Sequence, residues 1–179
     1  MDNTTVKELE VIFRTSSSPD ELFDAFGIAI KSRIRDQDLY KTLLRNKALS
    51  TDEISMFAEK ICREFSDLSY NIYFCVGQLF ESISSYCKHH DKAFGYYKKA
   101  ASSQPDFNEP YLAMAKMYNH EFNIPKFESV AQEIESGISI VEIKSPLCFL
   151  LANLYHQKGE KDKGLNYQKL GEIFQREGK

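Results

Sequence analysis

The chain has 179 residues, of which 42% are hydrophobic and 27% are charged, a composition typical of a folded domain and not of a disordered chain. Its formal net charge of −3 and its isoelectric point near 5.8 give no electrostatic reason to expect a nucleic-acid partner, because phosphate binding needs a concentrated Lys/Arg surface. We therefore expect one continuous domain that does not bind nucleic acid.

The N-terminus and the cysteines indicate the compartment. No basic start followed by an apolar run is present, and no segment approaches about 18 uninterrupted apolar residues, so we expect neither a secretory signal nor membrane insertion. The four cysteines are widely spaced and form no CxxC pair, as is typical of buried thiols in a reducing compartment. We expect a cytoplasmic protein.

Apolar residues at helical spacing predict three helices in the first 45 residues. The first covers residues 6–13. Ser18 and Pro19, as N-cap and first-turn proline, begin a second helix that we expect to run to about residue 35. A short third helix is marked by Leu39, Tyr40, Leu43 and Leu44. The second helix carries large and small residues at positions i, i+3, i+4 and i+7, which are Phe23, Phe26, Gly27 and Ile30.

A capping box starts the next helix, since Ser50 is followed three residues later by Glu53. This helix is expected to bury Ile54, Phe57, Ala58, Ile61, Phe65 and Leu68.

Beyond residue 70 the same spacing of large and small residues occurs three times. The three sets are Tyr73, Val76, Gly77 and Phe80; Tyr111, Met114, Ala115 and Tyr118; and Cys148, Leu151, Ala152 and Tyr155. Their first members are 38 and 37 residues apart. A regular spacing of this size indicates a helical repeat array, in which each repeat contacts its neighbours.

Each repeat is expected to form two antiparallel helices. The first pair consists of a helix through Tyr73 and Phe80 that continues to about Cys87, a turn at residues 88–91, and a helix that ends before Pro105. The second runs from residue 109 to about 120, breaks at residues 123–125 and returns. The third starts at Ser145 and Pro146 and turns at Gly159. Its returning helix is expected to be lined by Leu165, Leu170, Ile173 and Phe174.

These segments resemble the tetratricopeptide repeat (TPR) family in two places. Residues 105–111 are similar to the junction in which a proline ends one repeat and an aromatic residue, here Tyr111, appears six positions later. Residues 145–171 are similar to a whole repeat, with Ala152 in the first helix, Gly159 at the turn, and the small residues Gly164 and Gly171 in the second. The separations of 38 and 37 residues exceed the 34-residue period typical of the family.

The resemblance implies an all-α fold of antiparallel helix pairs, stacked in a right-handed TPR-like superhelix with an N-terminal helical extension. We expect this extension at residues 1–68, as a cap, an interface or a degenerate repeat, and about three repeats at residues 69–107, 108–144 and 145–179. An alternative role for Leu9, Ile12 and Phe13 is pairing with a second copy of the chain, as a homodimer through the N-terminal helices.

In the TPR family the first helix of each repeat lines a concave groove that binds protein partners. The resemblance therefore implies a partner-binding groove made of Asn71, Phe74, Gln78, Leu112, Lys116, Asn119, Phe149, Asn153 and His156. Amide, aromatic and basic groups of this kind suit an extended peptide, because they bind both its backbone and its apolar side chains.

The sequence predicts a non-catalytic adaptor or scaffold that binds a protein or peptide segment and needs no cofactor. A TPR-type secretion chaperone that holds a client protein is an alternative. A second alternative, from another class, is a metal-dependent regulator or enzyme that uses Cys87, His89 and His90, the one cluster of metal-ligand side chains in the sequence. Zinc sites favour two pairs of such ligands, and no second pair exists, so the prediction is neither an enzyme nor a metal site.

Overall fold

The computed structural model describes residues 3–83 and 89–178, which form ten α-helices, one short 3-10 turn and no strand. The predicted all-α fold is therefore confirmed. By its internal contacts the chain divides into two compact units, Met1–Leu79 and Phe80–Lys179. The expected extension at residues 1–68 and the three repeat ranges remain predictions.

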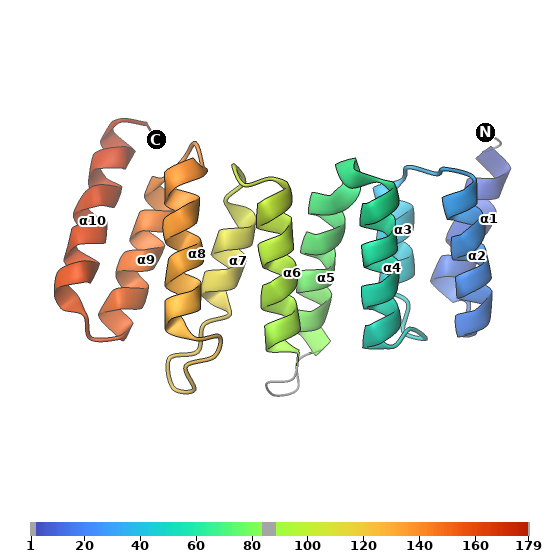
Figure 1. Cartoon of the computed structure of the whole chain (residues 1–179), viewed down its shortest axis with the longest axis horizontal. Helices are drawn as coiled ribbons and strands as arrows, with labels where there is room; N and C mark the ends of the chain where they lie inside the picture. The colour runs from blue at the N-terminus through green and yellow to red at the C-terminus, as the bar shows by residue number, and fades with distance from the viewer. Residues whose placement is uncertain (1–2, 84–88, 179) are drawn as a thin grey trace. The chain divides into compact units, whose positions relative to one another are not determined.

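Unit 1 contains four complete helices and most of a fifth (Figure 1). In it, α1 packs against α2 and α3, and α3 packs against α4. The helices are α1 (Asn3–Thr15), α2 (Pro19–Lys31), α3 (Gln37–Leu44), α4 (Thr51–Glu64), the 3-10 turn η1 (Ser66–Leu68) and α5 (Ser69–Ile83).

Both predicted N-caps of unit 1 are confirmed. The Ser18 side chain accepts a hydrogen bond from the Glu21 N–H, and Ser50 and Glu53 form the full capping box. However, α2 ends at Lys31, earlier than expected. Arg33 adopts a left-handed φ of 54°, and the N–H groups of Ser32, Arg33 and Ile34 bond back to helix carbonyls, so the helix closes there.

The residues predicted to be buried on α4 are buried, with one exception. Ile54, Phe57, Ala58, Ile61 and Phe65 are at most 4% exposed. Leu68 is only half-buried and lies in η1, because Phe65 leaves the helical conformation with φ −136° and ψ 79°. The expectation for Leu68 was wrong.

A half-buried polar side chain connects the end of α1 with the turn after α3. The Asn46 side-chain amide donates to the carbonyls of Phe13 and Ser16, both at 2.9 Å, and its carbonyl accepts from the Ala48 N–H at 2.8 Å. The turn after α3 is thereby fastened to the end of α1.

Apolar residues of α1 are part of the core of unit 1. Leu9 is 3% exposed and Phe13 is fully buried, so neither is free to pair with a second copy. Val11 is the large apolar residue that α1 exposes, at 60%. A homodimer through the N-terminal helices remains a prediction, without Leu9 and Phe13 in its interface.

Unit 2 contains the end of α5 and five further helices (Figure 1). Each helix packs against the next from α6 to α10, and α7 also packs against α9. This is the nearest-neighbour pattern of a helical repeat array. The helices are α6 (His90–Ser103), α7 (Glu109–Lys116), α8 (Phe127–Ile140), α9 (Ser145–Gln157) and α10 (Lys161–Arg176).

The connection from α7 to α8 differs from the expectation. We expected α7 to reach about residue 120, but it stops at Lys116. The Asn119 N–H bonds to the Ile124 carbonyl at 2.8 Å and the Ile124 N–H bonds back to Asn119, so these groups leave the helical pattern. The expected end of the preceding repeat's first helix near Cys87 and the start of its turn at Lys88 lie outside the described residues.

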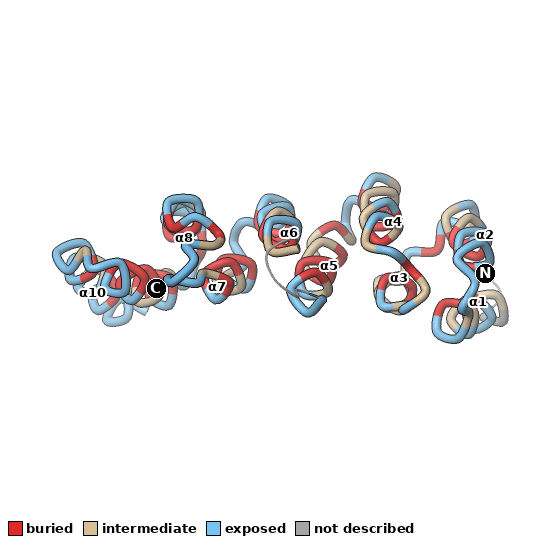
Figure 2. Tube along the Cα trace, turned by 90° about the horizontal axis from the view of Figure 1, so that it is seen from below, coloured by how far each residue is buried: buried red, intermediate tan, exposed pale blue. Residues whose placement is uncertain are grey.

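The three sets of large and small residues that share one spacing consist of packing residues, as their spacing predicts. Ten of their twelve members are buried, and Tyr73 and Tyr118 are half-buried. Buried and exposed residues alternate along α7, α8 and α9, as in amphipathic helices that pack by one face, and Figure 2 shows both kinds on α7 and α8.

Glycines allow close contacts within the helix pairs of unit 2. A Cβ on Gly137 of α8 would come within 2.9 Å of the Tyr111 ring on α7. On α10, a Cβ on Gly171 would come within 2.8 Å of the Phe149 ring, and one on Gly164 within 2.6 Å of the His156 ring. The aromatic rings of the first helix thus occupy the space that side chains would otherwise take.

The expectation for the apolar residues of α10 was partly wrong. Leu165 and Ile173 are 49% and 50% exposed, whereas Leu170 and Phe174 are half-buried. The buried residues of α10 are Gly164 and Gly171, because α9 approaches the helix along its glycine face.

Candidate binding surfaces

The nine residues of the predicted groove lie in both units. Asn71, Phe74 and Gln78 belong to α5 within unit 1, and the other six belong to unit 2. Gln78 is exposed, whereas Asn71 and Phe74 are half-buried. The Phe74 ring stacks on Tyr70, with ring centroids 6.0 Å apart.

The six groove residues of unit 2 have different surroundings. Lys116 and Asn153 are exposed and Leu112 is half-buried. The rings of Phe149 and His156 lie against the glycines of α10. The Asn119 side chain accepts hydrogen bonds from the N–H groups of Glu121 and Phe122, at 2.9 and 3.2 Å.

Structural contacts therefore occupy three of these six side chains, namely Asn119, Phe149 and His156. Lys116 on α7 and Asn153 on α9 are exposed, as is His156, whose ring lies against Gly164. The groove itself remains a proposal.

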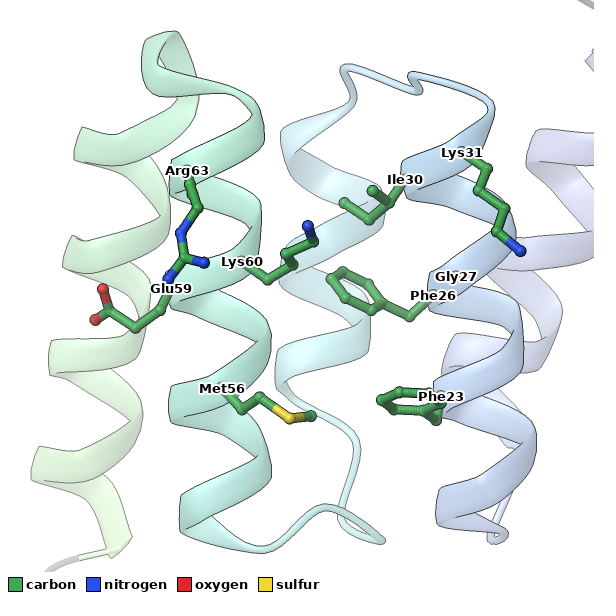
Figure 3. A pocket seen from close by; sticks show the side chains of 9 residues that line it. All are labelled: Phe23, Phe26, Gly27, Ile30, Lys31, Met56, Glu59, Lys60 and Arg63. Carbon is green, nitrogen blue, oxygen red and sulfur yellow. The ribbon is translucent and has the colours of Figure 1, made fainter.

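A second surface, which the sequence did not predict, is an open groove between α2 and α4 in unit 1 (Figure 3). Its volume is about 560 Å³. The lining comes from these two helices alone and comprises Phe23, Phe26, Gly27, Ile30, Lys31, Met56, Glu59, Lys60 and Arg63.

Aromatic packing under the groove holds its apolar part in place. The ring of the buried Phe57 lies 4.5 Å from that of Phe26 and 6.2 Å from that of Phe23, between centroids. Phe26 is 6% exposed, whereas Phe23 and Met56 expose 55% and 45% of their surface. The groove therefore has a packed base and two large apolar side chains open to solvent.

The groove is basic at one end. Figure 3 shows Phe23 and Met56 near the N-terminal parts of α2 and α4, with Lys31 and Arg63 toward their C-terminal ends. Among the described residues, Lys31 and Arg63 form no ion pair, and Lys60 pairs with Glu64 at 2.7 Å. With Glu59 as the acidic member, the lining carries three cationic side chains and one anionic side chain.

Sequence reasoning missed this groove because the spacing of Phe23, Phe26, Gly27 and Ile30 does not say which neighbouring helix this face meets. In the structure α2 is the second helix of an antiparallel pair with α1 (Figure 1), and this face is turned toward α4. The sequence signal for this groove is a pair of large apolar residues, Phe23 and Met56. Each lies beside the buried stripe of its helix and not within it.

A polar cluster in unit 2 connects α8, α9 and α10. The hydroxyls of Tyr155 and Tyr167 donate to Glu135 at 3.1 and 2.9 Å, and the two rings stack 5.6 Å apart. Burial, together with the nearby Glu135 carboxylate, raises the pKa of Tyr155 to about 12. Because its polar groups bond to one another, the cluster holds the helices together.

The structure describes only part of the alternative metal site. Cys87 lies outside them, and the His89 ring stacks on Phe80 with centroids 6.1 Å apart. Within residues 3–83 and 89–178, no three His, Cys, Asp or Glu side chains come together to hold a metal ion. None of the helices in these ranges is long and apolar enough to span a membrane.

Comparison with known proteins identifies the fold. No family model matches the chain and no curated protein matches it in sequence. Two crystal structures of MamA are 15% and 14% identical, with TM-scores of 0.55 and 0.56, and they cover 99% and 98% of this chain and 97% and 94% of their own. A third structure, MamA MSR-1 C2, is 12% identical, with a TM-score of 0.52, and covers 99% of this chain and all of its own. MamA is a TPR-like all-helical protein, and this chain has a TPR-like all-α fold.

Proposed function

We propose that this chain is a protein-binding scaffold without catalytic activity and that the α2–α4 groove is its principal binding surface. The observation that carries the proposal is the exposure of Phe23 and Met56, side by side, over a packed aromatic base. Exposed apolar side chains bordered by charged ones are typical of interaction sites. The lining contains no Ser, Cys or His side chain.

The exposed faces of α7 and α9 are the second surface of this proposal. Lys116 and Asn153 are solvent-accessible there and offer hydrogen bonds to a partner. The family resemblance supports this surface, and the TPR-like fold shared with MamA is consistent with scaffolding.

Site-specific photo-crosslinking in the native cell tests the proposal. A photo-reactive phenylalanine analogue replaces Phe23 or Met56 in the groove, and Lys116 or Asn153 on the second surface. The matched control places the analogue at Val11, which is apolar, 60% exposed and on α1. We expect the same partner to crosslink from positions 23 and 56 and not from position 11.

A companion experiment separates the two surfaces. Replacing both Lys116 and Asn153 by Ala is expected to weaken a partner that binds the second surface, while the melting temperature stays unchanged because both side chains are exposed. Equal labelling from Val11 and the groove, or no labelling from any of the four positions, would contradict the proposal. A client that becomes unstable once released would favour the chaperone form of this function.

A further inference from the structure

We propose that the α2–α4 groove binds a short amphipathic α-helix of a partner protein, with apolar side chains along one face and acidic side chains at one end of that face. This inference rests on the proposed function and specifies the chemistry of the partner.

The groove offers an extended backbone no neutral hydrogen-bonding side chain. The groove is lined by apolar side chains and by the charged ends of Lys31, Glu59, Lys60 and Arg63, without an Asn, Gln, Ser or Thr. The main chains of α2 and α4 are occupied by their own helical hydrogen bonds. An extended peptide would find only these charged groups as partners for its N–H and C=O groups, whereas a helix satisfies its own.

The length of the groove matches a short helix. Phe23 and Ile30 lie seven residues apart on α2, and Met56 and Arg63 lie seven apart on α4, so each side of the groove extends about 10 Å at the helical rise. Apolar side chains at i, i+3 or i+4, and i+7 of a ligand helix cover the same distance. The groove therefore fits about two turns of helix.

The cationic side chains of the groove lie toward one end. Lys31 is the last residue of α2, and Lys60 and Arg63 lie in the last turns of α4, so the cations gather at one end of the groove. Phe23 and Met56 lie toward the other end (Figure 3). A complementary ligand carries its acidic side chains at the end that meets these cations and its apolar side chains beyond them.

A displayed peptide library tests this pattern with the full chain as target. The peptides are helical, about 14 residues or four turns long, with apolar residues at the three facing positions and Glu, Lys or Gln varied at both ends. We expect selection to enrich Glu at one end only. Binding of the selected peptide should weaken as ionic strength rises, because exposed charge pairs are screened.

Charge reversal in the groove provides the discriminating variant. Replacing Lys60 and Arg63 by Glu is expected to weaken the selected peptide about tenfold and to strengthen binding of the same peptide with Lys in place of Glu. The matched control replaces Lys7 and Lys47 by Glu, which are exposed in unit 1 and absent from the groove lining; it changes the net charge equally and should leave the affinity unchanged. The gain for the Lys peptide cannot arise from unfolding.

The outcomes distinguish this inference from the proposed function. Enriched peptides without a preference for Glu, or with equal loss in the control variant, would overturn the acidic-helix inference, while crosslinking from Phe23 would still support a binding groove. Selection of extended, non-helical peptides in the same groove would overturn it as well. If no peptide is enriched and no partner crosslinks from Phe23 or Met56, both proposals fail.

Discussion

The ring of Tyr111 lies so close to Gly137 that a Cβ on this glycine would be 2.9 Å from its Cδ1 atom. Tyr111 has little room to move, because it is 3% exposed and its hydroxyl donates to the Pro105 carbonyl at 3.1 Å. The contact joins α7 to α8, and it depends on the absence of a side chain at Gly137.

Gly137→Ala is therefore expected to destabilise the protein. Overpacking typically costs about 1–3 kcal/mol, and the better helix propensity of Ala offsets about 1 kcal/mol of this. Urea unfolding followed by circular dichroism measures the difference. Gly95→Ala is the control, since a Cβ there meets nothing within 4 Å; it should stabilise the protein by up to about 1 kcal/mol. Equal effects of the two substitutions would argue against the Tyr111 contact.

Ala152→Leu tests the packing of α9. Ala152 is 3% exposed on α9, so a larger side chain must displace its neighbours, at a typical cost of about 1–3 kcal/mol. The adjacent Asn153 is exposed, and Asn153→Leu is expected to change the unfolding free energy by less than about 0.5 kcal/mol. Thermal and urea unfolding of both variants measure the contrast, and similar stabilities would show that α9 does not face inward at Ala152.

Asn46→Ala tests the connection between α1 and the turn after α3. The substitution removes the donors for the carbonyls of Phe13 and Ser16 and the acceptor for the Ala48 N–H, and we expect a loss of about 1–3 kcal/mol. Lys47→Ala, at the exposed neighbouring position, should change stability by less than about 0.5 kcal/mol. A cost for Asn46→Ala no larger than for this control would contradict the role of the amide.

Ser50→Ala tests the capping box and its pH dependence. Hydrogen bonds from the Ser50 side chain and backbone lower the pKa of Glu53 below its ordinary value. Because the folded pKa is the depressed one, the stabilisation is fully present above the unfolded pKa, near 4.3, and is lost as the pH falls through the folded pKa. We expect Ser50→Ala to cost about 1 kcal/mol at pH 7 and less at pH 3. A cost that is independent of pH would exclude the Glu53 contribution.

The sequence predicted those parts of the fold that local chemistry determines. Ser18 and Ser50 each combine a capping side chain with suitable following residues, and the spacing of Val76, Met114 and Leu151 reflects the buried side of a helix. Helix ends were predicted less well. Arg33 and Asn123 adopt left-handed φ values of 54° and 50°. Neither the arginine at position 33 nor the place of Asn123 before Ile124 and Pro125 predicts this conformation unambiguously.

The binding surfaces depend on which helix faces which neighbour. Phe149 and His156 occupy the expected positions along α9, yet their rings contact Gly171 and Gly164, a relation between helices that spacing along one helix does not encode. Phe23 and Met56 come together only through the placement of α2 beside α4 (Figure 3). Periodicity therefore predicts a buried side, whereas a groove requires the tertiary arrangement.

The glycine face of α10 has a consequence for local motion. Because Gly164 and Gly171 are its buried residues and Leu165 and Ile173 remain half exposed, α10 removes less of its own apolar surface from water than α8, which buries Val130, Ile134 and Ile138. Detachment of α10 should then require less free energy than unfolding of unit 2. Its amide hydrogens are expected to exchange with deuterium through this opening while those of α8 stay protected.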